Sequence, residues 1–253
     1  MKIAACDYDG TLFRHGRVSR EDLEAIEAWR GNGHLFGLAT GRDLNLTRTE
    51  VEHYSIPLDF IVCNTGASIY DPDFNPLNLV SLPPPAVNMV FDHSLTPKSR
   101  YFLISRAGST YIYNQSAKSW LTGLGLPLEY IDETSARAMT GIQQIGLEFE
   151  DQATAALVTG IYNADFGPTL HAQNSGICVD LVAGGITKAE GISTYLGLQD
   201  LRPELVLAMG DSENDLSMFE RFLGYAMKES PDSLKAAAGA VVDSPAEALW
   251  ANL

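Results

Sequence analysis

Positive charge is scarce in this chain of 253 residues. Lys and Arg number 17 against 32 Asp and Glu, so the net charge is −15 at pH 7. Proteins that bind nucleic acids need basic surfaces to neutralise phosphates, and this balance argues against a nucleic-acid partner. No apolar run approaches the roughly 18 residues of a membrane span, and the first one stops at Asp7, too early for a signal peptide. We therefore expect a cytoplasmic protein that does not contact membranes.

Cysteine is also scarce, and histidine follows no metal-binding pattern. Cys6, Cys63 and Cys178 stand in apolar stretches without Cys-x-x-Cys or Cys/His clustering, and the five histidines lack the spacing of a metal site. Free cysteines in such stretches usually behave as small apolar residues. We therefore expect three reduced, buried thiols, and neither a catalytic cysteine nor a thiol-bound metal.

The composition, 45% apolar and 19% charged residues, is ordinary for a globular protein. Segments typical of strands alternate with segments typical of helices in the first 82 residues and again from Gly184 onward. Strands are predicted at 3–6, 35–39, 59–63 and 205–209. One helix is predicted after Ser19, which begins a capping box, and two more at 43–54 and 189–196. This alternation is typical of a parallel sheet covered by helices on both faces.

The pattern changes in the middle of the chain. Pro83-Pro84-Pro85 favours an extended connector over a helix. Beyond it, strands are predicted at 101–105, 110–114, 142–149 and 177–182, a turn at His171 and Asn174, and a helix capped by Asp151 with the apolar stripe Ala153, Ala156, Leu157 and Ile161. We expect an α/β fold with a Rossmann-like parallel-sheet core, residues 1–82 and 184–253. A mixed α/β domain, residues 83–183, is inserted into it and is called the insert below.

Polar clusters follow three predicted strands of the core. Asp7 and Asp9 follow the first strand and Thr40 the second, while Asp211, Asn214 and Asp215 follow the strand that ends at Met209. Ligands bind at the carboxyl ends of parallel strands. Two carboxylates about 4 Å apart repel by roughly 4 kcal/mol at an effective dielectric of 20, so four of them at one edge predict a divalent cation. Because all the expected ligands are oxygen atoms, Mg²⁺ is the expected ion.

Each cluster taken alone has a simpler interpretation. Asp7 to Thr11 could form a polar turn after a strand, and Asp211 with Ser212 could cap the helix that follows. Lys188 argues for a site, because it opens a helix, where the macrodipole disfavours a cation by roughly a few tenths of a kcal/mol. Arg42 leaves two interpretations open: contact with the substrate or the insert, and a solvated surface charge.

These motifs resemble those of the haloacid dehalogenase superfamily. The matching segments, in order, are Asp7-Tyr8-Asp9-Gly10-Thr11, Thr40-Gly41-Arg42, Lys188 and Gly210-Asp211-Ser212-Glu213-Asn214-Asp215. The insert lies between the second and third motifs and resembles the cap of Cof-type phosphatases, which closes over the active site. Thr65 and Ala189 depart from the Asn and Gly that are common in that branch, whereas the catalytic set is intact.

The resemblance implies a role for each matched residue. Asp7 would be the nucleophile that takes the phosphoryl group, and Asp9 would protonate the leaving alcohol and then activate water. Mg²⁺ would be held by Asp7, the backbone carbonyl of Asp9 and Asp211, with Asp215 behind them. The phosphate would be held by Thr40, Lys188, Asn214 and the segments around Tyr8, Gly10 and Gly41.

The sequence thus predicts a Mg²⁺-dependent phosphatase of small phosphorylated metabolites, with sugar phosphates as the expected class. A sugar-phosphate mutase of the same superfamily is the alternative. Dehalogenase chemistry is disfavoured, because a halide leaving group does not need the acid Asp9. A phospho-acceptor switch is disfavoured because Asp9 and an insert of 101 residues favour sequestered turnover. No motif identifies the physiological substrate or the oligomeric state.

Overall fold

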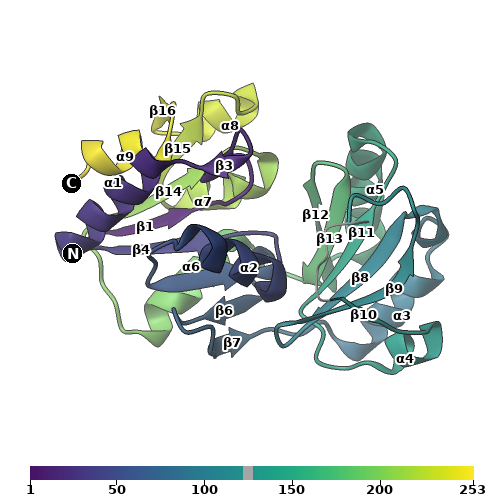
Figure 1. Ribbon diagram of the computed structural model, residues 1–253. Helices are drawn as coiled ribbons and strands as arrows, with labels where there is room; N and C mark the ends of the chain where they lie inside the picture. Colours follow the sequence, from purple (N-terminus) through teal and green to yellow (C-terminus); the bar gives the residue numbers. More distant parts are fainter. Residues whose placement is uncertain (122–127) are drawn as a thin grey trace.

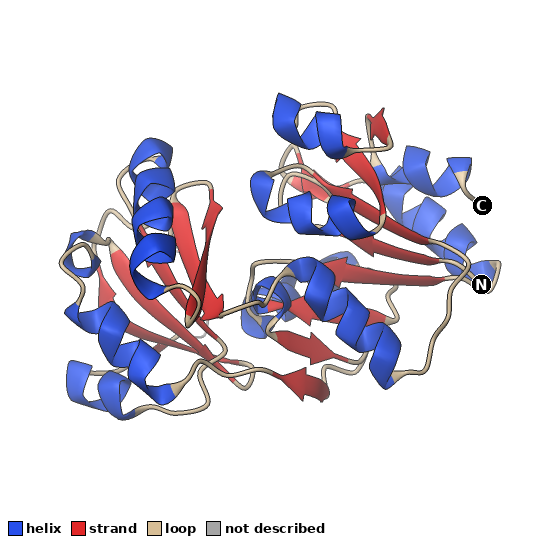
Figure 2. Cartoon of the chain, turned by 180° about the vertical axis from the view of Figure 1, so that it is seen from behind, coloured by secondary structure: helices blue, strands red, loops and turns tan. Residues whose placement is uncertain are grey.

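The computed structural model describes residues 1–121 and 128–253 and shows two main sheets, each with helices and an apolar core of its own (Figure 1). Segments from both ends of the chain build the larger sheet, and the two termini lie close together beside it. The smaller sheet consists of residues of the insert alone (Figure 2). In the described ranges no helix is both long and apolar enough to cross a membrane.

The larger sheet has eight strands. They are β1 (Ile3–Cys6), β4 (Leu35–Ala39), β5 (Phe60–Cys63), β6 (Ser68–Tyr70), β7 (Pro76–Leu79), β14 (Val206–Gly210), β15 (Leu223–Met227) and β16 (Ala240–Val242). Their order is β16-β15-β14-β1-β4-β5-β6-β7. All neighbours from β16 to β5 are parallel, and β6 and β7 return antiparallel at one edge. The carboxyl ends of β1, β4 and β14 therefore meet at the same side.

Helices cover both faces of this sheet. One face carries α1 (Arg20–Gly31), α2 (Leu44–Tyr54) and α9 (Pro245–Ala251), and the other carries α6 (Lys188–Leu198), α7 (Leu216–Arg221) and α8 (Asp232–Ala237). Ser19 caps α1 as predicted, because its hydroxyl accepts the N–H of Asp22 at 3.1 Å. Short elements complete this part: the hairpin β2 (Phe13–Arg14) and β3 (Arg17–Val18), and the single turns η1 (Asn64–Gly66) and η3 (Glu213–Asp215). The predicted α/β fold class is confirmed.

The smaller sheet is mixed and has helices on one face. Its strands are β8 (Tyr101–Arg106), β9 (Ser109–Gln115), β10 (Glu129–Tyr130), β11 (Gln144–Glu148), β12 (Leu170–Ser175) and β13 (Cys178–Ala183), in the order β10-β9-β8-β11-β13-β12. The accompanying helices are α3 (Pro84–Asp92), α4 (Glu133–Ala138), α5 (Gln152–Phe166) and the turn η2 (Thr96–Lys98). Successive side chains of a strand point to opposite faces. Phe102 and Ile104 thus pack on the helices, whereas Tyr101 and Leu103 face the larger sheet.

The prolines at 83–85 do not form an extended connector throughout, which corrects the prediction. Pro83 is extended and caps α3, and Pro84 and Pro85 are its first two residues. The first N–H groups of a helix have no partner within it, so proline loses no hydrogen bond there. The triplet therefore begins a helix that the sequence pattern did not reveal.

Two further predictions in the insert were wrong. The predicted stripe of α5 faces outward, with Leu157 65% exposed, while Ala155, Val158, Tyr162 and Phe166 are buried against β12 and β13. This helix is apolar on most sides, and burial of its two aromatic rings removes more apolar surface from water. His171 and Asn174 belong to strand β12, and the turn lies at Gly176 and Ile177.

Candidate active site

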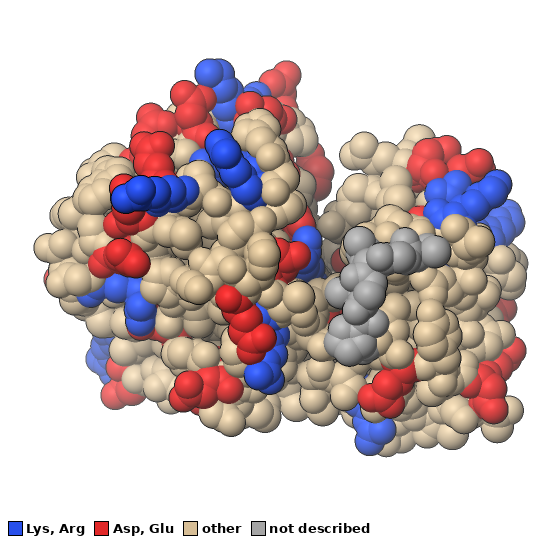
Figure 3. Space-filling model, viewed as in Figure 1, with Lys and Arg blue, Asp and Glu red and all other residues tan. Residues whose placement is uncertain are grey.

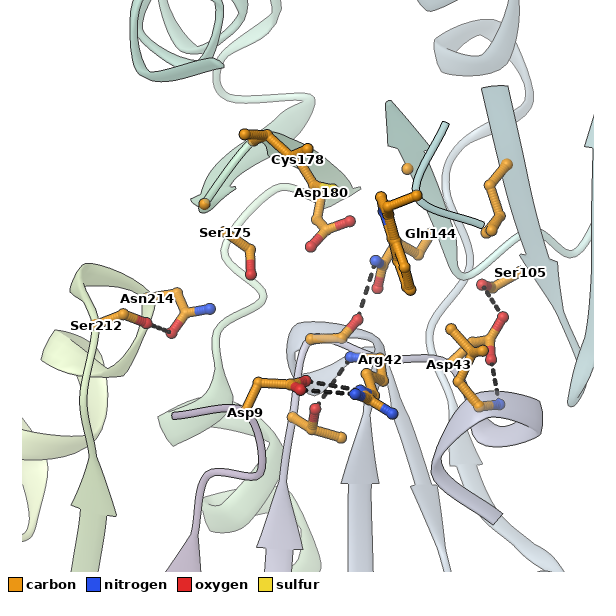
Figure 4. Close-up of a pocket in the computed structure, with 18 of the residues that line it drawn as sticks. Asp9, Arg42, Asp43, Ser105, Gln144, Ser175, Cys178, Asp180, Ser212 and Asn214 are labelled. Carbon is orange, nitrogen blue, oxygen red and sulfur yellow. Dashed lines mark hydrogen bonds and ion pairs between the residues drawn. The ribbon is translucent and has the colours of Figure 1, made fainter. Parts of the chain in front are cut away.

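A cavity of about 360 Å³ opens between the two sheets, beside the carboxyl ends of β1, β4 and β14. Figure 3 shows the cleft from outside, and Figure 4 shows the side chains that line it. A cavity of this size suits a small organic ligand. Its core side is lined by Asp7, Asp9, Thr40, Gly41 and Asn214. The structure thus brings together predicted site residues that follow three different strands.

Lys188 is the centre of a buried charge cluster at this edge. Its ammonium donates to Asp7 Oδ1 at 2.7 Å, to Asp215 Oδ1 at 2.6 Å and to Asn214 Oδ1 at 3.2 Å. All three ammonium hydrogens are therefore in use. Burial lowers the pKa of Lys188, but the negative charges of Asp215 and Asp7 outweigh burial and raise it above its ordinary value. The side chain stays cationic although it is fully buried.

Asp7, Asp211 and Asp215 form an acidic cluster that fits a divalent cation. Each offers a carboxylate oxygen within 4.8 Å of the others. Lys188 neutralises one of the three negative charges, which leaves an excess of two. Asp215 Oδ2 already accepts the N–H groups of Asp211 and Ser212, at 2.9 and 3.1 Å. The carboxylates closest to the cavity are those of Asp7 and Asp211, and such hard oxygen donors fit Mg²⁺.

The pKa values of two carboxyl groups reflect this crowding. Burial raises the pKa of Asp7, and the charge of Lys188 opposes that rise. Burial, together with the negative charge of Asp215, raises the pKa of Asp211 to about 6. A cation bound between the two groups would favour the ionised form of both.

Gly10 lets the chain pass close to Asp211. Its φ is +81°, and a Cβ at this position would lie 2.3 Å from Asp211 Oδ2, so that only glycine fits. The Gly10 N–H donates to the carbonyl of Phe13 at 2.9 Å and is not available to a phosphate. Thr11 supports the same carboxylate, because its hydroxyl donates to Asp211 Oδ1 at 3.0 Å. Gly10 therefore shapes the turn after β1 and does not offer its amide to a ligand.

Asp9 lies at the mouth of the cavity and is held by Arg42 (Figure 4). Arg42 donates from Nε to Asp9 Oδ2 at 2.7 Å and from Nη2 to Asp9 Oδ1 at 2.6 Å, so both carboxylate oxygens are bonded. Glu50 accepts from Arg42 Nη1 at 3.3 Å and from the Tyr8 hydroxyl at 2.7 Å. The Arg42 side chain is 20% exposed. The interpretation of Arg42 as a solvated surface charge is therefore wrong.

Several uncommitted donors face the cavity beside Asp7. The Thr40 hydroxyl oxygen accepts the N–H of Arg42 at 3.1 Å, which leaves its own proton free to be donated. Asn214 Oδ1 accepts from Lys188 and from the Ser212 hydroxyl, which leaves the amide NH₂ of Asn214 for a ligand. In the part of the chain that the structure describes, no acceptor is bonded to the N–H of Tyr8 or Gly41. Such donors suit the oxygens of a phosphate.

The insert supplies the second wall of the cavity, as its resemblance to a cap led us to expect, but with residues that the sequence did not identify. Ser105, Gln144, Cys178 and Asp180 line the cavity from strands β8, β11 and β13. Cys178 is thus only partly buried, unlike Cys6 and Cys63, which are buried as predicted. Asp180 stands within the apolar run from Ile177 to Val182. A single charged residue in an otherwise apolar strand was the signal that could have identified it.

Asp43, at the start of α2, joins the two walls. Its carboxylate accepts the N–H of Leu46 at 2.9 Å and the hydroxyls of Thr110 and Ser105, at 2.5 and 3.3 Å. Gln144 makes a second link, because its Nε2 donates to the carbonyl of Gly41 at 3.1 Å. The insert therefore contacts the core next to the residues that face the proposed phosphate position.

Comparison with known proteins identifies the family. The family of haloacid dehalogenase-like hydrolases matches residues 4–248, and the chain belongs to it. A curated relative from Bacillus subtilis, the 5-amino-6-(5-phospho-D-ribitylamino)uracil phosphatase YcsE, is 26% identical over 98% of this chain and 92% of its own length. The predicted superfamily is confirmed. The predicted enzyme class, a phosphoric monoester hydrolase, is confirmed at the level of the class, because curated relatives are named phosphatases.

Solved structures of the superfamily share the fold of the whole chain. A HAD/COF-like hydrolase from Plasmodium vivax is 19% identical, with a TM-score of 0.79, and the match covers 98% of this chain and 94% of that one. The HAD subclass IIB sugar phosphatase BT4131 is 21% identical, with a TM-score of 0.79 and coverage of 98% and 95%. The similarity in fold thus extends to a Cof-like member, as the resemblance of the insert led us to expect.

Proposed function

We propose that this protein is a Mg²⁺-dependent phosphatase of small phosphorylated metabolites that works through an aspartyl phosphate on Asp7. The observation that carries the proposal is the placement of Asp7. Its Oδ1 accepts from buried Lys188 at 2.7 Å, its carboxyl group lines the cavity, and Asp211 lies beside it. A carboxylate held in this way can attack phosphorus with its second oxygen once a cation separates it from Asp211.

Asp7 and Asp9 divide the chemistry in the proposed reaction. Asp7 attacks the phosphorus atom, the bond from phosphorus to the ester oxygen breaks, and Asp9 gives its proton to the departing alcohol. Asp9 then takes a proton from water, which attacks the aspartyl phosphate, so that inorganic phosphate leaves and Asp7 is regenerated. Both oxygens of Asp9 are bonded to Arg42 in the structure, so one of these bonds must be exchanged for a bond to the substrate.

Charge neutralisation is the second requirement of the reaction, because an anion attacks an anion. Bound Mg²⁺ would supply positive charge between Asp7 and Asp211, where the structure leaves two negative charges in excess. Lys188 contributes its charge from beneath, while Thr40, Asn214 and the N–H groups of Tyr8 and Gly41 would orient the phosphate oxygens. Positioning and electrostatic stabilisation account for most of the catalysis of phosphoryl transfer.

The proposed substrates are sugar and polyol phosphates. YcsE, the relative described above, is named for a substrate in which a ribityl chain carries the phosphate, and we include that compound among the candidates. We further propose that residues 83–183 form a cap domain on a catalytic core of residues 1–82 and 184–253. The cavity between the two sheets supports this division, because each sheet supplies one of its walls.

The test is release of inorganic phosphate from a panel of sugar, polyol and nucleotide phosphates, with and without Mg²⁺. We expect hydrolysis that stops on chelation and returns with Mg²⁺; full activity after removal of divalent ions would refute the proposal. Asp9→Asn with an activated ester should accumulate phosphoenzyme, because the second step loses its base. A mutase would instead return phosphorylated isomers and need a bisphosphate activator, and a phospho-acceptor switch would hold its phosphoryl group for a long time.

A further inference from the structure

Asp180 is a buried carboxylate without a cationic partner of its own. It is 9% exposed and lines the cavity from the middle of β13. No ion pair among the described residues includes it, and Lys188 is bonded to Asp7 and Asp215 instead. The Gln144 amide partly opposes the rise in the pKa of Asp180, and its Nε2 donates to the carbonyl of Gly41 at 3.1 Å. Most of the hydrogen-bonding capacity of this carboxylate is therefore unused.

A second acceptor beside Asp180 is also unused. Gln144 Oε1 is buried and has no hydrogen-bond partner. A buried acceptor without a donor costs free energy, and a ligand that brings a donor removes this cost. Asp180 and Gln144 stand on adjacent strands of the same face and both line the cavity. This wall of the cavity therefore presents hydrogen-bond acceptors, and a ligand with hydrogen-bond donors would complement it.

The space next to Asp180 is left open by glycine. Gly146 is its direct partner in the β11–β13 pairing. A Cβ on Gly146 would lie 3.4 Å from Asp180 Oδ1, and a Cβ on Gly41 would lie 3.4 Å from Asp180 Oδ2. The Asp180 carboxylate thus lies close to Gly41, whose N–H faces the proposed phosphate position. A group attached to that phosphate and extending toward the insert would reach Asp180 (Figure 4).

The charge of the wall excludes some leaving groups. Arg42 is the one lysine or arginine among the described residues lining the cavity, and it is bonded to Asp9 and Glu50. Burial raises the pKa of Asp180 to about 7, so its carboxyl group is negatively charged above that pH. Under those conditions a second anionic group on the substrate would meet this charge without a free cation to balance it, and like charges in a partly buried site repel strongly. A neutral group rich in hydroxyls meets no such penalty.

We infer that Asp180, together with Gln144, determines specificity for the leaving group: the pair binds the hydroxyl donors of a neutral polyol or sugar and rejects esters that carry a second anionic group. The inference rests on the proposed phosphatase function and deepens it. Asp180 is a specificity residue in this account and takes no part in the transfer of the phosphoryl group.

The test compares substrates in the wild type, in Asp180→Asn and in the control Glu150→Gln, which removes an exposed charge of the insert away from the cavity. The substrates are ribitol 5-phosphate, p-nitrophenyl phosphate, which offers no hydroxyl donor, and 3-phosphoglycerate, which adds a carboxylate. Asp180→Asn should lower kcat/KM for ribitol 5-phosphate by about 10- to 100-fold, the loss of one hydrogen bond to a charged group. Hydrolysis of p-nitrophenyl phosphate should stay within about threefold, and discrimination against 3-phosphoglycerate should weaken.

A second variant keeps the carboxylate and narrows the space beside it. Gly146→Ala places a methyl group 3.4 Å from Asp180 Oδ1, in ordinary contact with Tyr101 and Leu103 at 3.7 and 3.8 Å, so the fold should tolerate it. It should weaken use of ribitol 5-phosphate more than that of p-nitrophenyl phosphate. Equal losses on both substrates, or no loss on either, in both variants would overturn the inference.

Binding separates this inference from the proposed function. With Mg²⁺ and Asp7 intact, calorimetry compares the phosphonate analogues of ribitol 5-phosphate and of ethyl phosphate, which cannot be hydrolysed, with and without Asp180→Asn. A selective loss of affinity for the ribitol analogue supports the role of Asp180 even if the wild type hydrolyses no ester, a result that would refute the phosphatase proposal alone. Unchanged affinities for both compounds would overturn the role of Asp180.

Discussion

Lys188 is the residue on which the buried charges of the site depend. Asp7 and Asp215 are almost completely removed from solvent, and each is bonded to the same ammonium. A buried ion pair is weak evidence of stability in itself, but loss of one partner leaves an uncompensated buried charge. The catalytic arrangement and the stability of this sheet edge therefore depend on one side chain.

Lys188→Gln should destabilise the protein, by about 3–5 kcal/mol in the absence of divalent ions, because two buried carboxylates lose their counter-charge. Mg²⁺ should restore part of that loss, since it can balance the same carboxylates. Urea unfolding with and without Mg²⁺ measures both effects. Lys228→Gln is the control, because Lys228 forms an exposed pair with Asp243. A Lys188→Gln variant as stable as the wild type would contradict the geometry described here.

Asp7→Asn should abolish turnover, with kcat at least about a thousandfold lower, because an amide neither attacks phosphorus nor binds Mg²⁺ well. Lys188 keeps Asp215 as a partner, so the fold should survive, which circular dichroism would verify. Asp73→Asn, an exposed aspartate of the same part of the chain, should leave activity unchanged. Residual activity of Asp7→Asn within tenfold of the wild type would exclude Asp7 as the nucleophile.

At the scale of single elements, Asp180 in strand β13 makes the stability of the protein depend on pH. Burial raises the pKa of Asp180 to about 7, and the hydrogen bond from Gln144 and the charge of Lys188 only partly oppose this. The folded state therefore binds this proton more tightly than the unfolded chain, whose aspartates titrate near 3.9. It follows that Asp180 lowers the free energy of unfolding as the pH rises from about 4 to about 7.

Asp180→Asn lacks that titration and should gain stability relative to the wild type as the pH rises. The difference should be small at pH 4 and reach on the order of a few kcal/mol at pH 8, because the variant buries no charge. Thermal unfolding of both proteins at the two pH values measures it. Changes common to both, such as general repulsion at a net charge of −15, cancel in the comparison. An equal difference at both pH values would show that Asp180 is not a buried, titrating group.

The core was predictable because its motifs obey a simple rule of parallel sheets. Asp7, Thr40 and Asp211 each follow a short apolar strand, so their convergence at one edge follows from the strand pattern alone. β1 lies between β14 and β4, which places Asp7 between the other two. Contacts between residues about 180 to 200 positions apart, such as Lys188 with Asp7 and Thr11 with Asp211, were thus anticipated in outline.

The insert was less predictable, because its elements carry weaker signals. Its helix α5 is apolar on several sides, so periodicity did not identify the buried face, and α3 begins with prolines that resemble a connector. The position of Asp180 beside Gln144 and Gly146 depends on the antiparallel register of β11 and β13. Because α5 and β12 separate β11 from β13 in the sequence, neither strand alone determines the register between them. The arrangement of Asp180, Gln144 and Gly146 on the insert side of the cavity therefore required the structure.

At the scale of the whole molecule, two chain crossings and a few hydrogen bonds join the core to the insert. The exit runs through Gly184 and Gly185, the latter with φ +82°. The links beside the cavity include those of Asp43 with Thr110 and Ser105 and of Gln144 with Gly41. Others lie next to the chain crossings, such as those of Gln143 with Ser81 and of His171 with the carbonyl of Ile186. Junctions of this kind permit rigid-body rotation, and closure would exclude water from the reacting groups.

We therefore predict two orientations of the insert. Small-angle scattering of the protein with Mg²⁺ and a phosphate mimic should give a smaller radius of gyration than the protein with Mg²⁺ alone. Phosphoproteins should be poor substrates, because closure of the insert over a cavity of about 360 Å³ would exclude a polypeptide. Asp7→Asn is the control for the scattering change, since it weakens the site that the mimic occupies. Identical scattering curves, together with efficient hydrolysis of a phosphoprotein, would show that the insert is neither a lid nor a selector.

The place of β1 in the larger sheet has a consequence for how the protein is made. β1 leaves the ribosome about two hundred residues before its neighbour β14. Until then Asp7 has neither Lys188 nor Asp211 beside it, and one edge of β1 is unpaired. The insert, whose sheet uses only its own strands, is complete by Ala183 and can fold first. The edge of the sheet that carries Asp7, Lys188 and Asp211 therefore cannot assemble until β14 has been translated, and an open strand edge has to be protected during that interval.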